Sequence, residues 1–390
     1  MSFNIYDIDN EKKQEDEQAG LEYERIEEED KIETPFDAEK IRIEQRMLSL
    51  KYMKELIDTG LMNLSPDFQR NVVWKEIRRK SLLIESLMLR IPIPAFYFYE
   101  DEDSVLHVID GLQRLTTINS FLDNNYKLKG LQYLQETCDG MYFSDLNAKY
   151  VSRIYMTQLP VNVIDARTPS QVKYDLFRRI NTGGVSLNAQ EIRNSIAKPR
   201  VREFLKRLAY SESFIKATGG GVNDMRMAAQ ELVLRFVAFY SAYDYKIGRI
   251  NYHKSDLEYF LDQAFEQLNI ANEEKLLHLE KAFIKAMDNA YILFGDYAFR
   301  KCNFSDLQSG RRNLINKSLF VAWSVLLAEK QLKNNVFINK IDNPIRMLAR
   351  MIEKDEDYLR AITIGTNSAR QVEMNFTKTN KLWEKLNFDI

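Results

Sequence analysis

The sequence holds few of the residues that build metal centres and disulfide frameworks. Its 390 residues include 2 cysteines and 3 histidines. Cys138 and Cys302 have no metal-ligand spacing, and one pair of cysteines makes no disulfide framework. We therefore expect ordinary buried thiols and a cytosolic location. So few histidines argue against a metallohydrolase that is rich in histidine ligands.

Long apolar runs are also missing. No stretch approaches the ~18 apolar residues that a transmembrane helix needs. The N-terminus lacks the basic region and apolar stretch of a signal peptide. We therefore expect a cytoplasmic protein. With 45% hydrophobic residues over this length, the chain can bury a sizeable core and is expected to hold two domains.

The formal net charge of −2 hides an uneven distribution. Residues 1–33 hold thirteen acidic and four basic residues, a net charge of −9, which leaves about +7 on residues 34–390 by subtraction. The acidic stretch has few apolar residues, so we interpret residues 1–46 as a mobile or loosely helical segment. Two roles stay open, a solubilising tail and a docking arm that covers a basic groove.

Residues 47–197 mix short strands with helices. The strand-like runs are 61–64, 95–99, 104–109 and 159–164, and helical spacing marks 49–58, 75–89, 112–122, 144–156 and 169–180. Asn188, with Glu191 three residues later, predicts a capped helix through Ile196. This order predicts an α+β domain with a small mixed sheet. Residues 198–390 show helical spacing almost throughout and are expected to form an all-α domain.

The most informative stretch runs from Val105 to Arg114. An apolar strand-like run stops at Asp110, turns at Gly111 and enters an amphipathic helix with Gln113 and Arg114 in its first turn. A glycine permits such a sharp turn. The free N–H groups, the helix dipole and an arginine then meet at one point, which suits a phosphate group.

Each side chain of this turn has a functional and an ordinary interpretation. Arg114 could bind β- or γ-phosphate oxygens, or form a surface salt bridge. Asp110 could hold Mg²⁺ through water, or cap the helix. Gln113 could orient an attacking water or bind the nucleotide. Gly111 is needed for the backbone shape in either case.

Four motifs together resemble a known family. In chain order they are Asp67-Phe68-Gln69-Arg70 with Trp74, Ile91-Pro92-Ile93-Pro94, Val108-Ile109-Asp110-Gly111-Leu112-Gln113-Arg114-Leu115-Thr116-Thr117, and Phe177-Arg178-Arg179-Ile180-Asn181-Thr182-Gly183-Gly184. The order resembles the DGQQR-bearing N-terminal domain of GmrSD-type modification-dependent restriction enzymes. The resemblance covers about residues 47–197. It implies a fold similar to ParB and sulfiredoxin, and binding and hydrolysis of a nucleoside triphosphate with Mg²⁺ in phage defence.

Two features depart from the family pattern. Leu112 replaces the first glutamine of the motif, which puts hydrolysis rather than binding in question. Many relatives carry a C-terminal HNH nuclease domain, and we expect none within this sequence, because His253 and His278 stand in helical stretches without a cluster of further ligands. We therefore expect an NTPase subunit of a restriction system that regulates or recruits a nuclease partner. Whether it forms an oligomer stays open.

Further residues are candidates for the nucleotide pocket. Gln69 and Arg70 form a polar pair beside the first predicted strand of the domain, although Arg70 could instead stack on Trp74. The resemblance places Asn181 in the pocket, although a helix C-cap also explains it. Arg178 could add positive potential near the phosphates.

A basic helix motivates an alternative function. Lys75, Arg78, Arg79 and Lys80 could attract DNA phosphates, or form a solvated helix face. The alternative is a ParB-like DNA-binding module, in which a nucleotide acts as a switch without catalysis. No helix-turn-helix or zinc-finger pattern supports specific base recognition.

Overall fold

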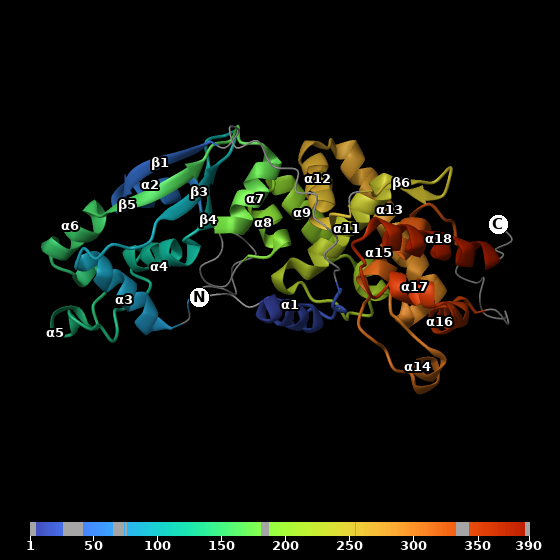
Figure 1. Ribbon diagram of the computed structural model, residues 1–390. Coiled ribbons are helices and arrows are strands. Elements are labelled where there is room, and N and C mark those ends of the chain that lie inside the picture. The colour runs from blue at the N-terminus through green and yellow to red at the C-terminus, as the bar shows by residue number, and fades with distance from the viewer. Residues whose placement is uncertain are drawn as a thin grey trace. The chain divides into compact units, whose positions relative to one another are not determined.

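The computed structural model describes residues 5–25, 42–64, 74, 76–180, 187–253, 255–332 and 343–386. It divides the chain into two compact units, Pro35–Ile196 and a second unit that combines Met1–Thr34 with Ala197–Ile390. The first unit is thus inserted, in the order of the chain, between two parts of the second. Figure 1 shows the elements of each unit.

The first unit is built on a mixed five-stranded sheet. In chain order its strands are β1 Ile43–Ser49, β2 Met62–Asn63, β3 Phe96–Glu100, β4 Leu106–Asp110 and β5 Gln158–Ile164. The spatial order is β1-β5-β3-β4-β2. Pairs β1–β5 and β3–β4 are antiparallel, whereas β3–β5 and β2–β4 are parallel. The sheet therefore begins at Ile43, inside the stretch that the sequence assigned to the N-terminal segment.

One face of the sheet holds the core of this unit. Phe96, Phe98, Val161 and Val163 alternate along β3 and β5 and are buried against the neighbouring helices. Such alternation is what a strand with one apolar face requires. The helices on this face are α2 Leu50–Asp58, α3 Ile77–Met88, α4 Leu112–Leu122 and α6 Ala148–Met156, and the short helix α5 spans Gln135–Cys138.

Helix α7, Ser170–Ile180, covers part of the opposite face. The Phe177 ring meets the Tyr99 ring edge-on, at 6.5 Å between centroids. Helix α8, Ala189–Ser195, follows it, and Asn188 and Glu191 form a capping box at its start. The predicted capped helix is confirmed.

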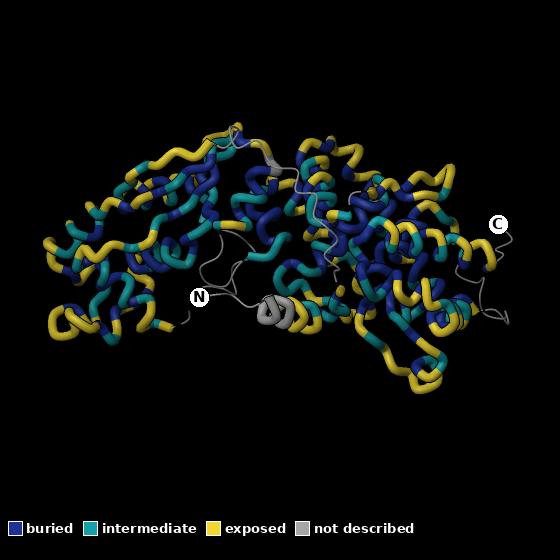
Figure 2. The backbone as a smooth tube through the Cα atoms, viewed as in Figure 1, coloured by how far each residue is buried: buried dark blue, intermediate teal, exposed yellow. Residues whose placement is uncertain are grey.

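The second unit is almost entirely helical. Its helices are α1 Ile5–Gln18, α9 Pro199–Ala209, α10 Glu212–Ala217, α11 Ala228–Ala242, α12 Leu257–Ile270, α13 Glu273–Phe294, α14 Phe304–Ser309, α15 Lys317–Ala328, α16 Pro344–Lys354, α17 Glu356–Ala361 and α18 Ala369–Lys385. Helix α15 is buried along its whole length, in the dark blue interior of this unit in Figure 2. The prediction of a helical domain is confirmed, and within it Tyr243–Asp244 and Arg249–Ile250 pair as a short β-hairpin.

The acidic N-terminal segment packs on the helical unit over residues 12–25, and α1 fits the helical alternative of the prediction rather than the mobile one. Leu21 is 1% exposed and pairs with Ile315 through a backbone bridge. Basic side chains of the helical unit meet the acids, in the pairs Glu15–Arg226, Asp16–Lys317, Glu22–Lys301 and Glu24–Arg235. A segment that looks solvated in the sequence is ordered because its partners lie about 200 residues or more further along the chain.

The observed architecture confirms the predicted α+β class, with a small mixed sheet followed by a helical region. Both cysteines are buried free thiols, as expected. Within the described ranges, no helix is long and apolar enough to cross a membrane.

Candidate functional site

The predicted strand, turn and helix are present where β4 ends and α4 begins. Strand β4 ends at Asp110, Gly111 follows with a φ of 95°, and α4 starts at Leu112. The left-handed φ favours glycine. A Cβ atom on Gly111 would also lie 2.4 Å from Cδ1 of Phe96. Backbone conformation and close packing therefore both demand glycine at this turn.

The N-terminus of α4 has no side-chain cap. Gly111 is the N-cap residue and has no side chain that could accept a hydrogen bond. Its carbonyl accepts the N–H of Leu115 at 2.9 Å, but the N–H groups of Leu112 and Gln113 have no acceptor among the described residues. Two free donors at the positive end of a helix dipole form a site that suits an anion.

Arg114 clamps this turn to the start of β3. Its guanidinium donates to the carbonyls of Pro94 and Ala95 and to Oδ2 of Asp110, the last at 3.0 Å. The group also lies 4.4 Å from the centre of the Phe96 ring. Burial lowers the pKa of Arg114, although Asp110 opposes this shift. The guanidinium keeps a positive charge beside the turn, while part of its donor capacity is already used.

Asp110 and Gln113 differ in how much of each side chain is free. The Asp110 carboxylate is 32% exposed, and its Oδ1 has no partner among the described residues. Oε1 of Gln113 accepts the backbone N–H of Trp74 at 2.9 Å. Gln113 thereby ties α4 to the residue that stands just before α3. Through this contact Gln113 positions Trp74, a role that the sequence did not indicate.

The environment of Leu112 explains why a leucine replaces the first glutamine of the motif. Its side chain is 7% exposed and belongs to the hydrophobic core of the first unit. Leucine suits that environment, because burying an apolar side chain is favourable. In this chain the position therefore contributes a core residue, and the polar groups of the motif are Asp110, Gln113 and Arg114.

Several predicted site residues lie elsewhere or outside the described residues. Gln69, Arg70 and Asn181 fall outside the described ranges, as does Lys75. Arg178 lies on the last turn of α7 and pairs with Asp175 at 3.1 Å. The structure thus brings Asp110, Gly111, Gln113 and Arg114 together at one turn, and places Arg178 on a separate helix.

The basic side chains of α3 lie against aromatic and backbone surfaces. Arg79 stacks over Trp74, with its guanidinium carbon 4.2 Å from the ring centre, and Nζ of Lys80 lies 5.5 Å from the Tyr126 ring. The Arg78 side chain passes close to Gly130. None of these three cations pairs with an acid in the part of the chain that the structure describes. Arg78 and Arg79 are exposed, and their charges face solvent.

Asp110 offers a single carboxylate to a metal ion. The described residues contain no group of three or more His, Cys, Asp or Glu side chains that could hold a metal. Mg²⁺ often binds through one or two carboxylates and substrate phosphates, with water completing its shell. The turn therefore fits a Mg²⁺ ion that the phosphates of a ligand mainly hold.

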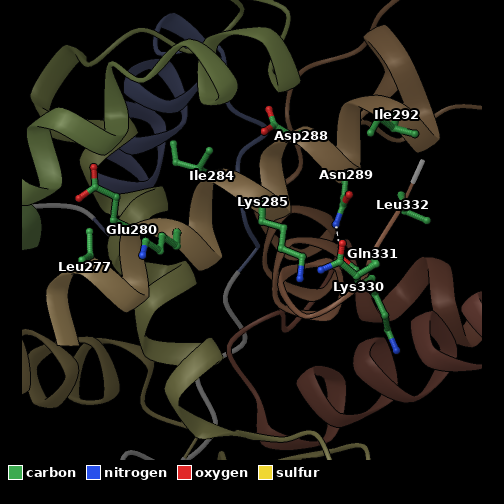
Figure 3. Close-up of a pocket in the computed structure, with 11 residues that line it drawn as sticks. Leu277, Glu280, Ile284, Lys285, Asp288, Asn289, Ile292, Lys330, Gln331 and Leu332 are labelled. Carbon is green, nitrogen blue, oxygen red and sulfur yellow. Dashed lines mark hydrogen bonds between the residues drawn. The ribbon is translucent and has the colours of Figure 1, made fainter. Parts of the chain in front are cut away.

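A groove of about 590 Å³ lies on the helical unit, along α13 and the residues that follow α15 (Figure 3). Leu277, Ile284 and Ile292 form its apolar part, and Lys281 and Lys285 stand beside them. No residue that the sequence predicted for a site lies in this groove. The β4–α4 turn and the groove therefore belong to different units of the chain.

Comparison with known proteins identifies the segment that carries the turn. No curated protein matches the sequence. Residues 51–198 match the family model described as GmrSD restriction endonuclease, N-terminal domain. This range contains the β4–α4 turn, the basic helix and α7, and it confirms the resemblance that the four motifs indicate. Over residues 51–198, the chain is therefore similar to the N-terminal domain of GmrSD restriction endonucleases.

Proposed function

We propose that the first unit binds and hydrolyses a nucleoside triphosphate at the β4–α4 turn, as part of a restriction system that acts in phage defence. The uncapped N-terminus of α4 carries the proposal, because the N–H groups of Leu112 and Gln113 have no acceptor among the described residues. They stand beside the Asp110 carboxylate, which is 32% exposed. Phosphate groups are the natural ligands of such helix ends. The family match supplies the restriction context.

Each side chain has a distinct task in this proposal. The N–H groups of α4 bind phosphate oxygens, and Asp110 holds Mg²⁺ together with those phosphates. Arg114 fixes the turn through Pro94 and Ala95 and adds positive charge. Gln113 holds Trp74, three residues before α3, in place. In hydrolysis, water attacks the γ-phosphorus, the bond to the β–γ bridging oxygen breaks, and a nucleoside diphosphate and phosphate leave. Positioning and charge stabilisation supply most of the catalysis in such reactions.

We propose that nucleotide hydrolysis by this chain acts on a second protein. A GmrSD-type system cuts DNA, so we propose that the nucleotide state of this chain regulates or recruits a nuclease subunit. The partner is expected to respond to the nucleotide, because a ligand shifts a conformational equilibrium only through its differential affinity for two states.

The experiment is equilibrium binding and phosphate release with ATP, GTP, CTP and UTP in the presence of Mg²⁺. Asp110→Asn should lower phosphate release on the order of 10- to 100-fold, as loss of a metal-supporting group commonly does. Asp103→Asn is the matched control, because Asp103 is an exposed acid in the turn between β3 and β4. Equal rates for the two variants would contradict the assignment of Asp110. Failure of all four nucleotides to bind the wild type would reject the nucleotide site.

The basic residues of α3 favour a second candidate function, DNA binding. Arg78 and Arg79 are exposed next to Lys80, and none of the three has an acidic partner among the described residues. If these residues contact phosphates, affinity for duplex DNA should fall steeply between 50 and 200 mM salt. The double variant Arg78→Gln/Arg79→Gln should flatten that dependence. An unchanged salt slope would count against this surface.

A further inference from the structure

A row of polar side chains crosses the sheet at the level of Asp110. In the strand register, Gln45 pairs with Asn162, and Asn162 pairs with Tyr97. Tyr97 pairs with Asp110 beyond a register shift between Tyr97 and Phe98, which leaves Ile109 as an extra residue on β4. Side chains of directly paired residues lie next to each other on the same face of a sheet. Three spacings of about 4.8 Å separate the two ends, so the row is ~14 Å long. We call Gln45, Asn162, Tyr97 and Asp110 the polar row.

The polar row faces away from the hydrophobic core. Tyr97 stands between Phe96 and Phe98, which are both fully buried in the core on the other side of the sheet. Asn162 stands in the same way between Val161 and Val163 on β5. Because side chains alternate along a strand, Tyr97 and Asn162 lie on the face opposite the core.

Helix α7 covers the neighbouring row of side chains on this face, whereas it leaves the polar row partly exposed. The covered row contains Tyr99 and His107, whose rings stack at 5.9 Å. Helix α7 covers it with Phe177 and with Lys173, whose Nζ lies 4.4 Å from the Tyr99 ring. The cover explains the burial of Tyr99, whereas Tyr97, two residues earlier, keeps partial exposure.

The polar row offers unused hydrogen-bonding and stacking groups. Tyr97 and Asn162 are partly exposed, and Gln45 is exposed at the edge strand β1. Among the residues that the structure describes, these three side chains make no hydrogen bond and Tyr97 makes no aromatic contact. An amide provides both a donor and an acceptor, and a phenol ring provides a flat apolar surface. These groups match a planar ring with polar edges.

The charge of the polar row also indicates the kind of ligand. Asp110 is the one acidic residue of the row, at the end where α4 begins, and the other three members are a tyrosine and two amides. A neutral polar surface that starts beside an anion site fits a ligand with a charged end and an uncharged end. A nucleotide has this division, with phosphates at one end and the sugar and base at the other.

We propose that the polar row binds the sugar and base of the nucleotide whose phosphates lie at the N-terminus of α4. This inference rests on the proposed function. Tyr97, next to Asp110, stacks against the base, and Asn162 and Gln45 bind the edge of the base. Base preference is then determined on β5 and β1, away from the sequence motif that binds the phosphates.

The test compares nucleotides with inorganic triphosphate, which has no base. Tyr97→Ala should lower affinity for the preferred nucleotide about tenfold or more, as expected for the loss of one stacking contact. The same variant should leave the affinity for inorganic triphosphate unchanged. Tyr97→Phe keeps the ring and should retain nucleotide affinity. Tyr133→Ala is the matched control, because Tyr133 is a tyrosine of the same unit with 75% exposure.

The outcomes separate this inference from the proposed function. Wild-type protein that binds neither nucleotide nor triphosphate would reject both. Normal nucleotide binding by Tyr97→Ala would reject the polar row alone, as would an equal loss of affinity for both ligands. Asn162→Ala should change the order of preference among ATP, GTP, CTP and UTP. An unchanged order would contradict base recognition by Asn162.

Discussion

Glu24 is expected to be the strongest attachment of the N-terminal segment to the helical unit. Its carboxylate accepts two hydrogen bonds from Arg235, at 3.2 and 2.7 Å, and one from Thr366 at 3.1 Å. Glu24 and Arg235 are both buried. The substitution Glu24→Gln keeps the shape of the side chain and removes its charge. It therefore isolates the contribution of the ion pair.

The loss of stability expected for Glu24→Gln depends on the ion pair that Arg235 retains. Removing one partner of a buried ion pair costs about 3–5 kcal/mol, because an uncompensated charge remains. Arg235 still meets Glu231 at 2.8 Å, so we expect the lower end, about 3 kcal/mol. Glu17→Gln is the matched control in the same segment. Its partner Lys13 is 4.0 Å away and both side chains are half exposed, so that variant should cost less than about 0.5 kcal/mol.

Urea unfolding monitored by tryptophan fluorescence measures both variants. Trp323 and Trp383 lie in the helical unit, and the background substitution Trp74→Phe removes the reporter of the other unit. A free energy of unfolding that differs by less than 0.5 kcal/mol between the two variants would refute the argument. That result would mean that Glu24 is not buried against Arg235.

Glu24 also makes the free energy of unfolding depend on pH. Burial alone would raise the pKa of Glu24, but the charges of Arg235 and Lys317 outweigh it and hold the pKa below its usual range. The stabilisation is therefore fully present above the unfolded-state pKa of about 4.3 and is lost as the pH falls through the lower folded-state value. The difference in stability between wild type and Glu24→Gln should shrink on acidification below that range. A constant difference would contradict the pairing.

Three further predictions concern other parts of the chain. Gly111→Ala should destabilise the first unit by about 1–3 kcal/mol, because it combines a left-handed φ with a contact against Phe96; unchanged urea unfolding would contradict this. Glu85→Gln should cost about 2 kcal/mol in the same assay, because its carboxylate accepts the backbone N–H groups of residues 132–134; an intact transition would show that the loop needs no anion. Burial raises the pKa of Cys302 to about 12, so its thiol should resist alkylation at pH 8 until the protein unfolds, and fast native-state labelling would count against its burial.

The β4–α4 turn was predictable because its information is local. An apolar run, the Asp110-Gly111 pair and an amphipathic continuation specify a strand, a turn and a helix within a dozen residues. The same local logic identified the capping box of Asn188 and Glu191. Helix α18, Ala369–Lys385, lies in the stretch that the sequence predicts to be helical, and it buries Val372, Phe376 and Leu382.

The contacts that complete the candidate site were not predictable, because they join distant parts of the chain. Gln113 binds Trp74 across 39 residues, and the polar row depends on the register of four strands. Strand β1 pairs with β5, about 115 residues later, so its residues looked like part of the acidic segment. The acids of that segment looked solvated for the same reason, since their basic partners lie in α11 and α15.

The most direct measurement is a crystal structure of the chain with Mg²⁺ and a slowly hydrolysed triphosphate analogue of the nucleotide that binds best. The account predicts phosphate density at the N–H groups of Leu112 and Gln113, with the base over Tyr97. Phosphates bound elsewhere, for example in the groove along α13, would contradict the assignment of the β4–α4 turn as the nucleotide site.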